Sequence, residues 1–247
     1  MACGCTIGGL CAAENPAYQI PKLKAALTID ANWDKSSWKN IRPLSLDQYM
    51  GEKPEHRPNT QVKMAYDDEA VYVIFRVEDR YVRSLMKEHQ KGVCQDSCVE
   101  FFFTPGPDVA AGYFYLEMNC SGTMLFRFNG PNKVVAFQKD EYSAMSIAHS
   151  LPETVDPEIQ TPVTWTLEYR LPFALLKKAC PLALPGPGVT WRANFYKCAD
   201  DSSHPHWLTW SPVDNPTPQF HMPKFFGVLN FGQSVGDQQI KETEKTK

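Results

Sequence analysis

The sequence of 247 residues has no apolar run of membrane-spanning length and no surplus of basic residues. A transmembrane helix needs roughly 20 consecutive apolar residues, so no such helix is predicted. The 25 lysines and arginines are outnumbered by 28 aspartates and glutamates, and the formal net charge is −3. Because nucleic-acid binding requires basic residues that neutralise phosphates, this balance argues against nucleic acid as a partner.

The chain also lacks the motifs of common enzyme classes. It contains no Gly-x-Ser-x-Gly, His-Glu-x-x-His or Gly-x-Gly-x-x-Gly pattern and no phosphate-binding loop. Eight cysteines are present without a Cys-x-x-Cys pair, so no zinc site is predicted from their spacing. The cysteines in the body of the chain are expected to be small buried residues. Cys98 and Cys120 are the candidate disulfide pair if the compartment is oxidising.

Long helical patterns are missing, and short alternating runs fill the chain instead. Residues 60–66 and 71–77 predict a hairpin, and residues 172–180 predict one short helix that begins at a proline. Many short strands with frequent turns favour an all-β fold, an antiparallel β-sandwich of the immunoglobulin or jelly-roll type with one or two short helices. No linker divides the body. We therefore expect one domain over residues 20–232, between a flexible lead-in (1–19) and a charged tail (233–247).

The stretch from residue 96 to 122 predicts a second hairpin with two unlike faces. In residues 113–119 the even positions are apolar, whereas the odd positions carry Tyr113, Tyr115, Glu117 and Asn119. Side chains alternate between the two faces of a strand, so one face should pack in the core. The other face is either a binding platform or a solvated outer surface.

Acidic residues cluster at the ends of the predicted strand over residues 71–77. Asp67, Asp68 and Asp79 could bind a hard cation such as Ca²⁺, which prefers oxygen ligands. The alternative is that they belong to ordinary turns, since the spacing of an EF-hand loop is absent.

More aromatic residues lie in loops and on strand faces than a core needs. They include Tyr115, Tyr196, Trp207, Trp210 and Phe220. Aromatic rings stack on the apolar face of a sugar, while carboxylates and amides bind its hydroxyl groups. This surplus therefore indicates a carbohydrate ligand.

An ordered series of short motifs resembles the carbohydrate-binding module family 9-like domain, which is related to the DOMON-like sandwiches. The resemblance spans residues 20–232 and rests on Ile29-Asp30…Trp33, Tyr66-Asp67…Val71-Tyr72-Val73…Val77-x-Asp79, Asp96-x-x-Val99-Glu100-x-Phe102, Glu117-x-Asn119-x-x-Gly122, Trp191-Arg-Ala-Asn194-Phe-Tyr196, Trp207-x-x-Trp210-Ser-Pro and Phe220-His-x-Pro223-x-x-Phe226-Gly227.

This resemblance implies a non-catalytic module that serves polysaccharide capture, with structural calcium in the founding members. It implies that Glu100 binds sugar hydroxyls and that Phe220 stands where one of two clamping tryptophans is expected. The other clamp tryptophan is missing, because Val93 and Cys94 occupy that region. The full set of predicted carbohydrate-binding residues is Glu100, Tyr115, Glu117, Asn119, Asn194, Tyr196, Trp207, Phe220 and His221.

Three alternative functions remain open on the sequence. A glycoside hydrolase could use Glu100 and Glu117 as its carboxyl pair, a haem-binding sandwich could use Met118 or His221 as an axial ligand, and a repurposed sandwich could bind a protein.

The first residues carry a possible localisation signal. No complete signal peptide is visible, but Ala2-Cys3 resembles the end of a bacterial lipoprotein cleavage site. We therefore expect an extracytoplasmic protein with a lipid anchor on Cys3.

Overall fold

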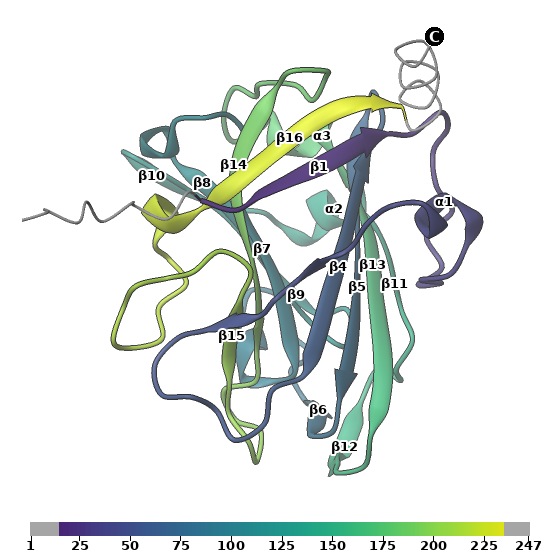
Figure 1. Ribbon diagram of the computed structural model, residues 1–247, viewed down its shortest axis with the longest axis vertical. Coiled ribbons are helices and arrows are strands. Elements are labelled where there is room, and N and C mark those ends of the chain that lie inside the picture. The colour runs from purple at the N-terminus through teal and green to yellow at the C-terminus, as the bar shows by residue number, and fades with distance from the viewer. Residues whose placement is uncertain (1–14, 235–247) are drawn as a thin grey trace, which may run out of the picture.

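The computed structural model describes residues 15–234, and its regular secondary structure is almost entirely β-strand (Figure 1). The strands are β1 (Ala17–Lys22), β2 (Leu44–Ser45), β3 (Gln48–Tyr49), β4 (Asn59–Tyr66), β5 (Ala70–Asp79), β6 (Val82–Ser84), β7 (Cys98–Thr104), β8 (Tyr113–Asn119), β9 (Met124–Gly130), β10 (Lys133–Ala136), β11 (Ser146–His149), β12 (Val155–Ile159), β13 (Val163–Pro172), β14 (Thr190–Cys198), β15 (Trp207–Thr209) and β16 (Gly227–Ser234). The α-helices are α1 (Ser36–Lys39), α2 (Lys139–Tyr142) and α3 (Phe173–Leu176), and single 3-10 turns span η1 (Val93–Gln95), η2 (Val109–Ala111) and η3 (Pro223–Phe225). Within residues 15–234, no helix has the length and apolar character needed to cross a membrane.

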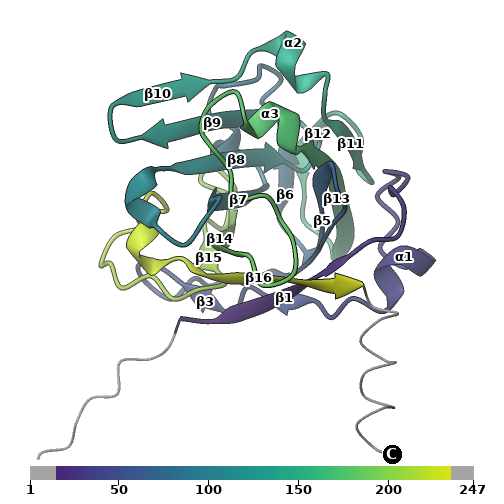
Figure 2. The same ribbon diagram turned by 90° about the horizontal axis from the view of Figure 1, so that it is seen from above.

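One curled sheet forms both layers of the molecule. Its main path runs β10-β9-β8-β7-β14-β16-β1-β4-β5-β13-β11, and β16 and β1 connect the two halves (Figure 2). The main core lies between these halves, where Phe75 of β5 meets Phe195 of β14 edge to face at 6.1 Å. The predicted all-β sandwich with short helices is confirmed.

The two predicted hairpins form. β4 pairs antiparallel with β5, and β7 pairs antiparallel with β8. On β7 and β8, Phe101, Phe103, Phe114 and Leu116 face the main core. The alternation of apolar residues in the sequence therefore identified the core face of this hairpin.

The outer face of this hairpin is covered rather than solvated. Phe102 and Tyr196 are fully buried there under Val213 and Phe226, which belong to the segment over residues 207–226. The alternative of a solvated outer surface is wrong, because this proline-rich segment folds back over β7, β8 and β14.

Three details differ from the expected antiparallel layout and boundaries. β1 runs parallel to β16 and makes one parallel pairing with β4. β1 also begins at Ala17, so residues 17–19, expected to belong to a flexible lead-in, form part of a strand that pairs with β16. The helix expected over residues 172–180 contains only Phe173–Leu176 as α-helix, and Pro181 follows shortly after.

Candidate functional site

A cavity of about 150 Å³ opens between the outer face of the β7–β8 hairpin and the segment over residues 207–226. Strands β7, β8 and β14 supply its floor, and β15 and the following loop supply its walls. The lining residues are Cys94, Glu100, Phe102, Glu117, Cys198, Asp200, Trp207, Pro218, Gln219, Phe220 and His221. Five predicted carbohydrate-binding residues therefore share one pocket, namely Glu100, Glu117, Trp207, Phe220 and His221.

Two glutamates lie opposite each other on the floor of this pocket. Glu100 of β7 pairs in register with Glu117 of β8, and both side chains are buried. Glu100 Oε1 accepts a weak hydrogen bond from Cys198 Sγ at 3.2 Å, and Oε2 has no partner among the described residues. Burial and the nearby Glu117 carboxylate raise the pKa of Glu100 well above its usual range.

The other two carboxyl groups of the pocket are also perturbed by burial. Burial, which outweighs the Arg127 guanidinium, raises the pKa of Glu117 to about 7. Burial likewise raises the pKa of Asp200, although Asp200 accepts a hydrogen bond from Trp207 Nε1 at 2.9 Å. A protonated carboxyl group both donates and accepts hydrogen bonds, whereas a carboxylate only accepts them, and a sugar hydroxyl can pair with either form.

Aromatic rings form the walls of the pocket. Phe220 stacks on Tyr196, with ring centres 4.1 Å apart and an angle of 13° between the ring planes. Tyr196 therefore covers one face of the Phe220 ring. Tyr115 lies beside the pocket and meets the His221 ring edge to face at 4.8 Å. Trp207 is held by its hydrogen bond to Asp200. These contacts fix ring positions before a ligand arrives.

Asn119, Asn194 and Tyr196 do not line the cavity. Asn119 and Asn194 are fully buried, and their amide groups bind neighbouring backbone. The hydroxyl of Tyr196 donates to the Phe220 carbonyl oxygen at 3.1 Å. These three residues position the site, and a direct contact with sugar stays a prediction that the geometry does not support.

The predicted calcium ligands are not brought together. Asp67 and Asp68 precede β5, whereas Asp79 is the last residue of this extended ten-residue strand. Asp67 accepts hydrogen bonds from the backbone nitrogens of Glu69 and Ala70 and from the Tyr72 hydroxyl, and Asp68 pairs with Lys22. The expectation of one cation site on these three aspartates is wrong, because β5 separates them.

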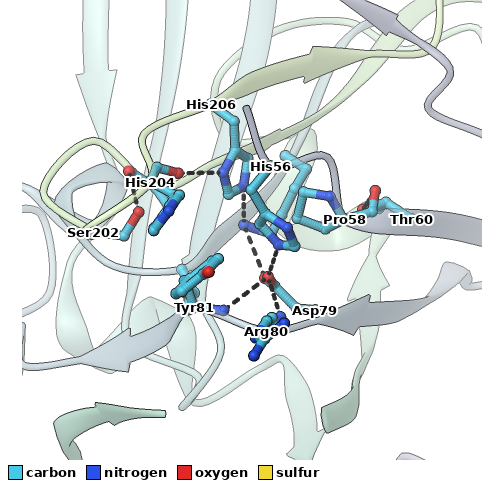
Figure 3. A network of polar contacts seen from close by, with 12 residues as sticks. His56, Pro58, Thr60, Asp79, Arg80, Tyr81, Ser202, His204 and His206 are labelled. Carbon is cyan, nitrogen blue, oxygen red and sulfur yellow. Dashed lines mark hydrogen bonds and ion pairs between the residues drawn. The ribbon is translucent and has the colours of Figure 1, made fainter. Parts of the chain in front are cut away.

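Asp79 instead belongs to a buried network with histidines (Figure 3). Its Oδ1 is 2.7 Å from His56 Nε2 and accepts a hydrogen bond from the backbone nitrogen of Arg80. Its Oδ2 is 3.6 Å from Lys197 Nζ, which also contacts His206 Nε2 at 2.7 Å. Burial alone would raise the pKa of Asp79, but Lys197 and His56 outweigh it and hold the pKa below its usual range.

The haem ligands considered from the sequence lie on opposite faces of the sheet. Met118 is buried in the main core, whereas His221 contacts Tyr113 and Tyr115 on the outer face. Met118 and His221 therefore cannot ligate one haem iron from its two sides, because β8 stands between them.

The sequence did not identify Asp200 or the grouping of cysteines at the pocket. Cys98 lies opposite Cys198 across β7 and β14, and Cys94 lines the cavity. The candidate pair of Cys98 and Cys120 is wrong, because Cys120 points into the main core. All five cysteines in residues 15–234 are free thiols. Only the pairing of distant strands reveals Cys98 and Cys198 as neighbours.

The comparison with protein families decides the relationship. The protein-family model described as "Carbohydrate-binding family 9" matches residues 32–231, which is most of the chain. The chain belongs to carbohydrate-binding family 9. The predicted family and the prediction of a carbohydrate-binding module are thereby confirmed. No curated protein matches the chain.

Solved structures with this family 9 fold resemble the chain along most of its length. A Bacteroides uniformis protein, provisionally named as carbohydrate-binding, has 25% identity and a TM-score of 0.78, over 88% of this chain and 100% of its own. A family 9 module from Caldicellulosiruptor kristjanssonii in complex with cellotriose has 16% identity and a TM-score of 0.59, over 90% of this chain and 96% of its own. A family 9 module from the same organism in complex with glucose has 16% identity and a TM-score of 0.58, over 89% of this chain and 98% of its own.

Proposed function

We propose that the pocket between Trp207 and Phe220 binds one sugar unit of a polysaccharide. The observation that carries this proposal is Glu100 Oε2, which is buried at the floor of a pocket with aromatic walls and finds no hydrogen-bond partner within residues 15–234. A buried polar atom without a hydrogen bond is costly, and a sugar hydroxyl would supply the missing bond. Glu117 and Asp200 offer further carboxyl groups to the same ligand.

Binding to cellotriose and glucose, with and without calcium, tests this proposal. These sugars are the first probes because they occupy the related Caldicellulosiruptor kristjanssonii module. Affinity is measured by isothermal titration calorimetry, followed by a panel of polysaccharides if neither probe binds. Release of reducing sugar is assayed on the same samples, since hydrolysis would instead support the glycosidase alternative with Glu100 and Glu117.

Two substitutions test the assignment of residues. Phe220→Ala removes a stacking surface worth about 1.5–3 kcal/mol when covered, so affinity should fall at least tenfold. Glu100→Gln should also weaken binding, because its carboxyl group lies on the floor. Phe225→Ala and Glu153→Gln are matched controls outside the cavity. If Phe220→Ala and Glu100→Gln both fold and bind sugar with unchanged affinity, this pocket is not the sugar site.

We also propose that the protein acts outside the cytoplasm and carries a lipid on Cys3. The support is the Ala2-Cys3 sequence, which lies outside the described residues. An in-frame apolar segment upstream in the gene, and loss of detergent-phase partitioning in Cys3→Ser expressed from the full gene, would support the proposal. Partitioning into the aqueous phase without this substitution would exclude the anchor.

A further inference from the structure

Two thiols and a carboxyl group converge beside the pocket floor. Cys98 of β7 lies directly opposite Cys198 of β14, and Glu100 follows two residues along β7 on the same face. One ligand atom from each residue lies within 4.8 Å of the others. All three side chains are buried. The proposed sugar contacts use only the free oxygen of Glu100 and give the two thiols no role.

The spacing of these atoms fits a tetrahedral ion. Zinc binds thiolate sulfur at about 2.3 Å and carboxylate oxygen at about 2.0–2.2 Å, which places sulfur and oxygen roughly 3.6 Å apart around the ion. The Sγ atoms of Cys198 and Cys98 lie 3.2 and 4.0 Å from Glu100 Oε1. The observed distances lie on either side of this value, so small side-chain shifts would complete the geometry.

Both carboxyl oxygens of Glu100 lack a strong hydrogen-bond donor among the described residues. Its Oε2 atom is buried with no hydrogen bond from the described residues, and its Oε1 atom is met only by thiols, which are weak donors. A buried acid in such surroundings is unfavourable unless a cation or donor accompanies it. Glu117 and Asp200 line the adjoining cavity and add negative potential when ionised.

We propose that Cys98, Cys198 and Glu100 bind one zinc ion. Thiolate ligands favour zinc over calcium or magnesium, which prefer oxygen. The cavity reaches Glu100 and Cys198 and gives the ion a route of entry, and the fourth coordination position is open to water. On binding, the two thiol protons and the carboxyl proton leave to solvent, and the ion takes their place. Glu100 Oε2 remains for the sugar.

The inference does not rest on the proposed function, because ion binding is measured without sugar. The full chain is prepared with Cys3, Cys5 and Cys11 replaced by serine, since these thiols also bind such ions. The protein is reduced with a phosphine, stripped with a chelator and titrated with Cd²⁺. We expect thiolate-to-cadmium absorption that saturates at one equivalent. X-ray absorption of the zinc form should show two sulfur neighbours at about 2.3 Å and oxygen neighbours.

Substitutions identify the ligands. Cys198→Ser and Cys98→Ser should each weaken cadmium binding more than about 100-fold, beyond the 10–100-fold effect of outer-shell changes. Glu100→Gln should weaken it at least tenfold while the charge-transfer absorption persists at high cadmium. Cys180→Ser is the matched control, because Cys180 lies in another part of the fold. Circular dichroism confirms folding of each variant.

Several outcomes would overturn the zinc site. Absence of the absorption at stoichiometric cadmium excludes it, and so do X-ray absorption data without sulfur neighbours. Equal loss of binding in Cys180→Ser would place the ion elsewhere. If protein purified without reductant contains a Cys98–Cys198 disulfide and the reduced form binds no cadmium, the pair is a redox pair instead. The X-ray absorption measurement needs no substitution at Cys98 or Cys198 and decides the question even if those variants fail to fold.

Discussion

Asn119 shows at the scale of one residue how a polar side chain on the pocket face can serve the fold. Its amide nitrogen donates hydrogen bonds to the Met86 carbonyl oxygen and to the Asp96 carboxylate. Its Oδ1 accepts hydrogen bonds from the backbone nitrogens of Ser121 and Thr123. All the polar capacity of the amide is used internally. Asn119 therefore holds the β8–β9 turn against the chain that leads into β7.

Asn119→Ala should reduce the free energy of unfolding by about 3 kcal/mol, because buried partners on both sides lose their hydrogen bonds. The sugar affinity of the folded variant should not change. Urea unfolding and calorimetry measure the two quantities. Asn132→Ala, at an exposed position, is the matched control. If Asn119→Ala lost sugar affinity without losing stability, Asn119 would be a residue that contacts the sugar.

His206 makes stability depend on pH. Burial and then the Lys197 side chain lower the pKa of His206 to about 3. In the unfolded chain a histidine binds a proton below about pH 6.5, whereas folded His206 does not until about pH 3. Stability should therefore fall as pH decreases through this range, by up to about 1.4 kcal/mol per pH unit.

Urea unfolding between pH 7 and pH 4.5 measures this dependence. His206→Gln should flatten the profile, because the group that binds its proton only in the unfolded chain is removed. An unchanged slope in His206→Gln would show that His206 is protonated in the folded protein over this range.

At the scale of the element, β16 depends on a glycine at its first position. A Cβ atom on Gly227 would lie 2.6 Å from the Trp210 ring and 2.7 Å from the Pro16 carbonyl oxygen. Gly227→Ala should therefore destabilise the protein by about 2 kcal/mol through overpacking. Gly186→Ala is the matched control, since a Cβ there meets nothing within 4 Å. Equal melting temperatures of the two variants would contradict this packing.

The sequence predicted elements better than it predicted their neighbours. Alternation over residues 113–119 identified both the strand and its core face, because burial of one face imposes a period of two. The same pattern could not show that residues 207–226 cover the other face. Nor could it show that Cys98 meets Cys198, since the register of distant strands depends on packing across the whole sheet. Motif order identified Glu100 and Phe220, but only geometry separated pocket residues from their supports.

At the scale of the whole molecule, the continuous sheet path supports a single cooperative unit. β1 and β16 join the two halves of the sandwich, and one core fills the space between them. We expect one urea transition, with coincident curves from tryptophan fluorescence and far-ultraviolet circular dichroism. Two separated transitions would show that residues 20–232 contain more than one folding unit.

The parallel pairing of β1 with β16 also determines how the molecule responds to tension. Ala17 begins β1 opposite Val228 near the start of β16, and Lys22 ends β1 opposite Ser234. Force that pulls Ala17 and Ser234 apart therefore acts along both strands in opposite directions. The hydrogen bonds between them are loaded together in shear and do not open one after another. If the protein chain is stretched between these two residues while the module holds a polysaccharide, the β1–β16 pair that joins the two halves of the sandwich would resist unfolding.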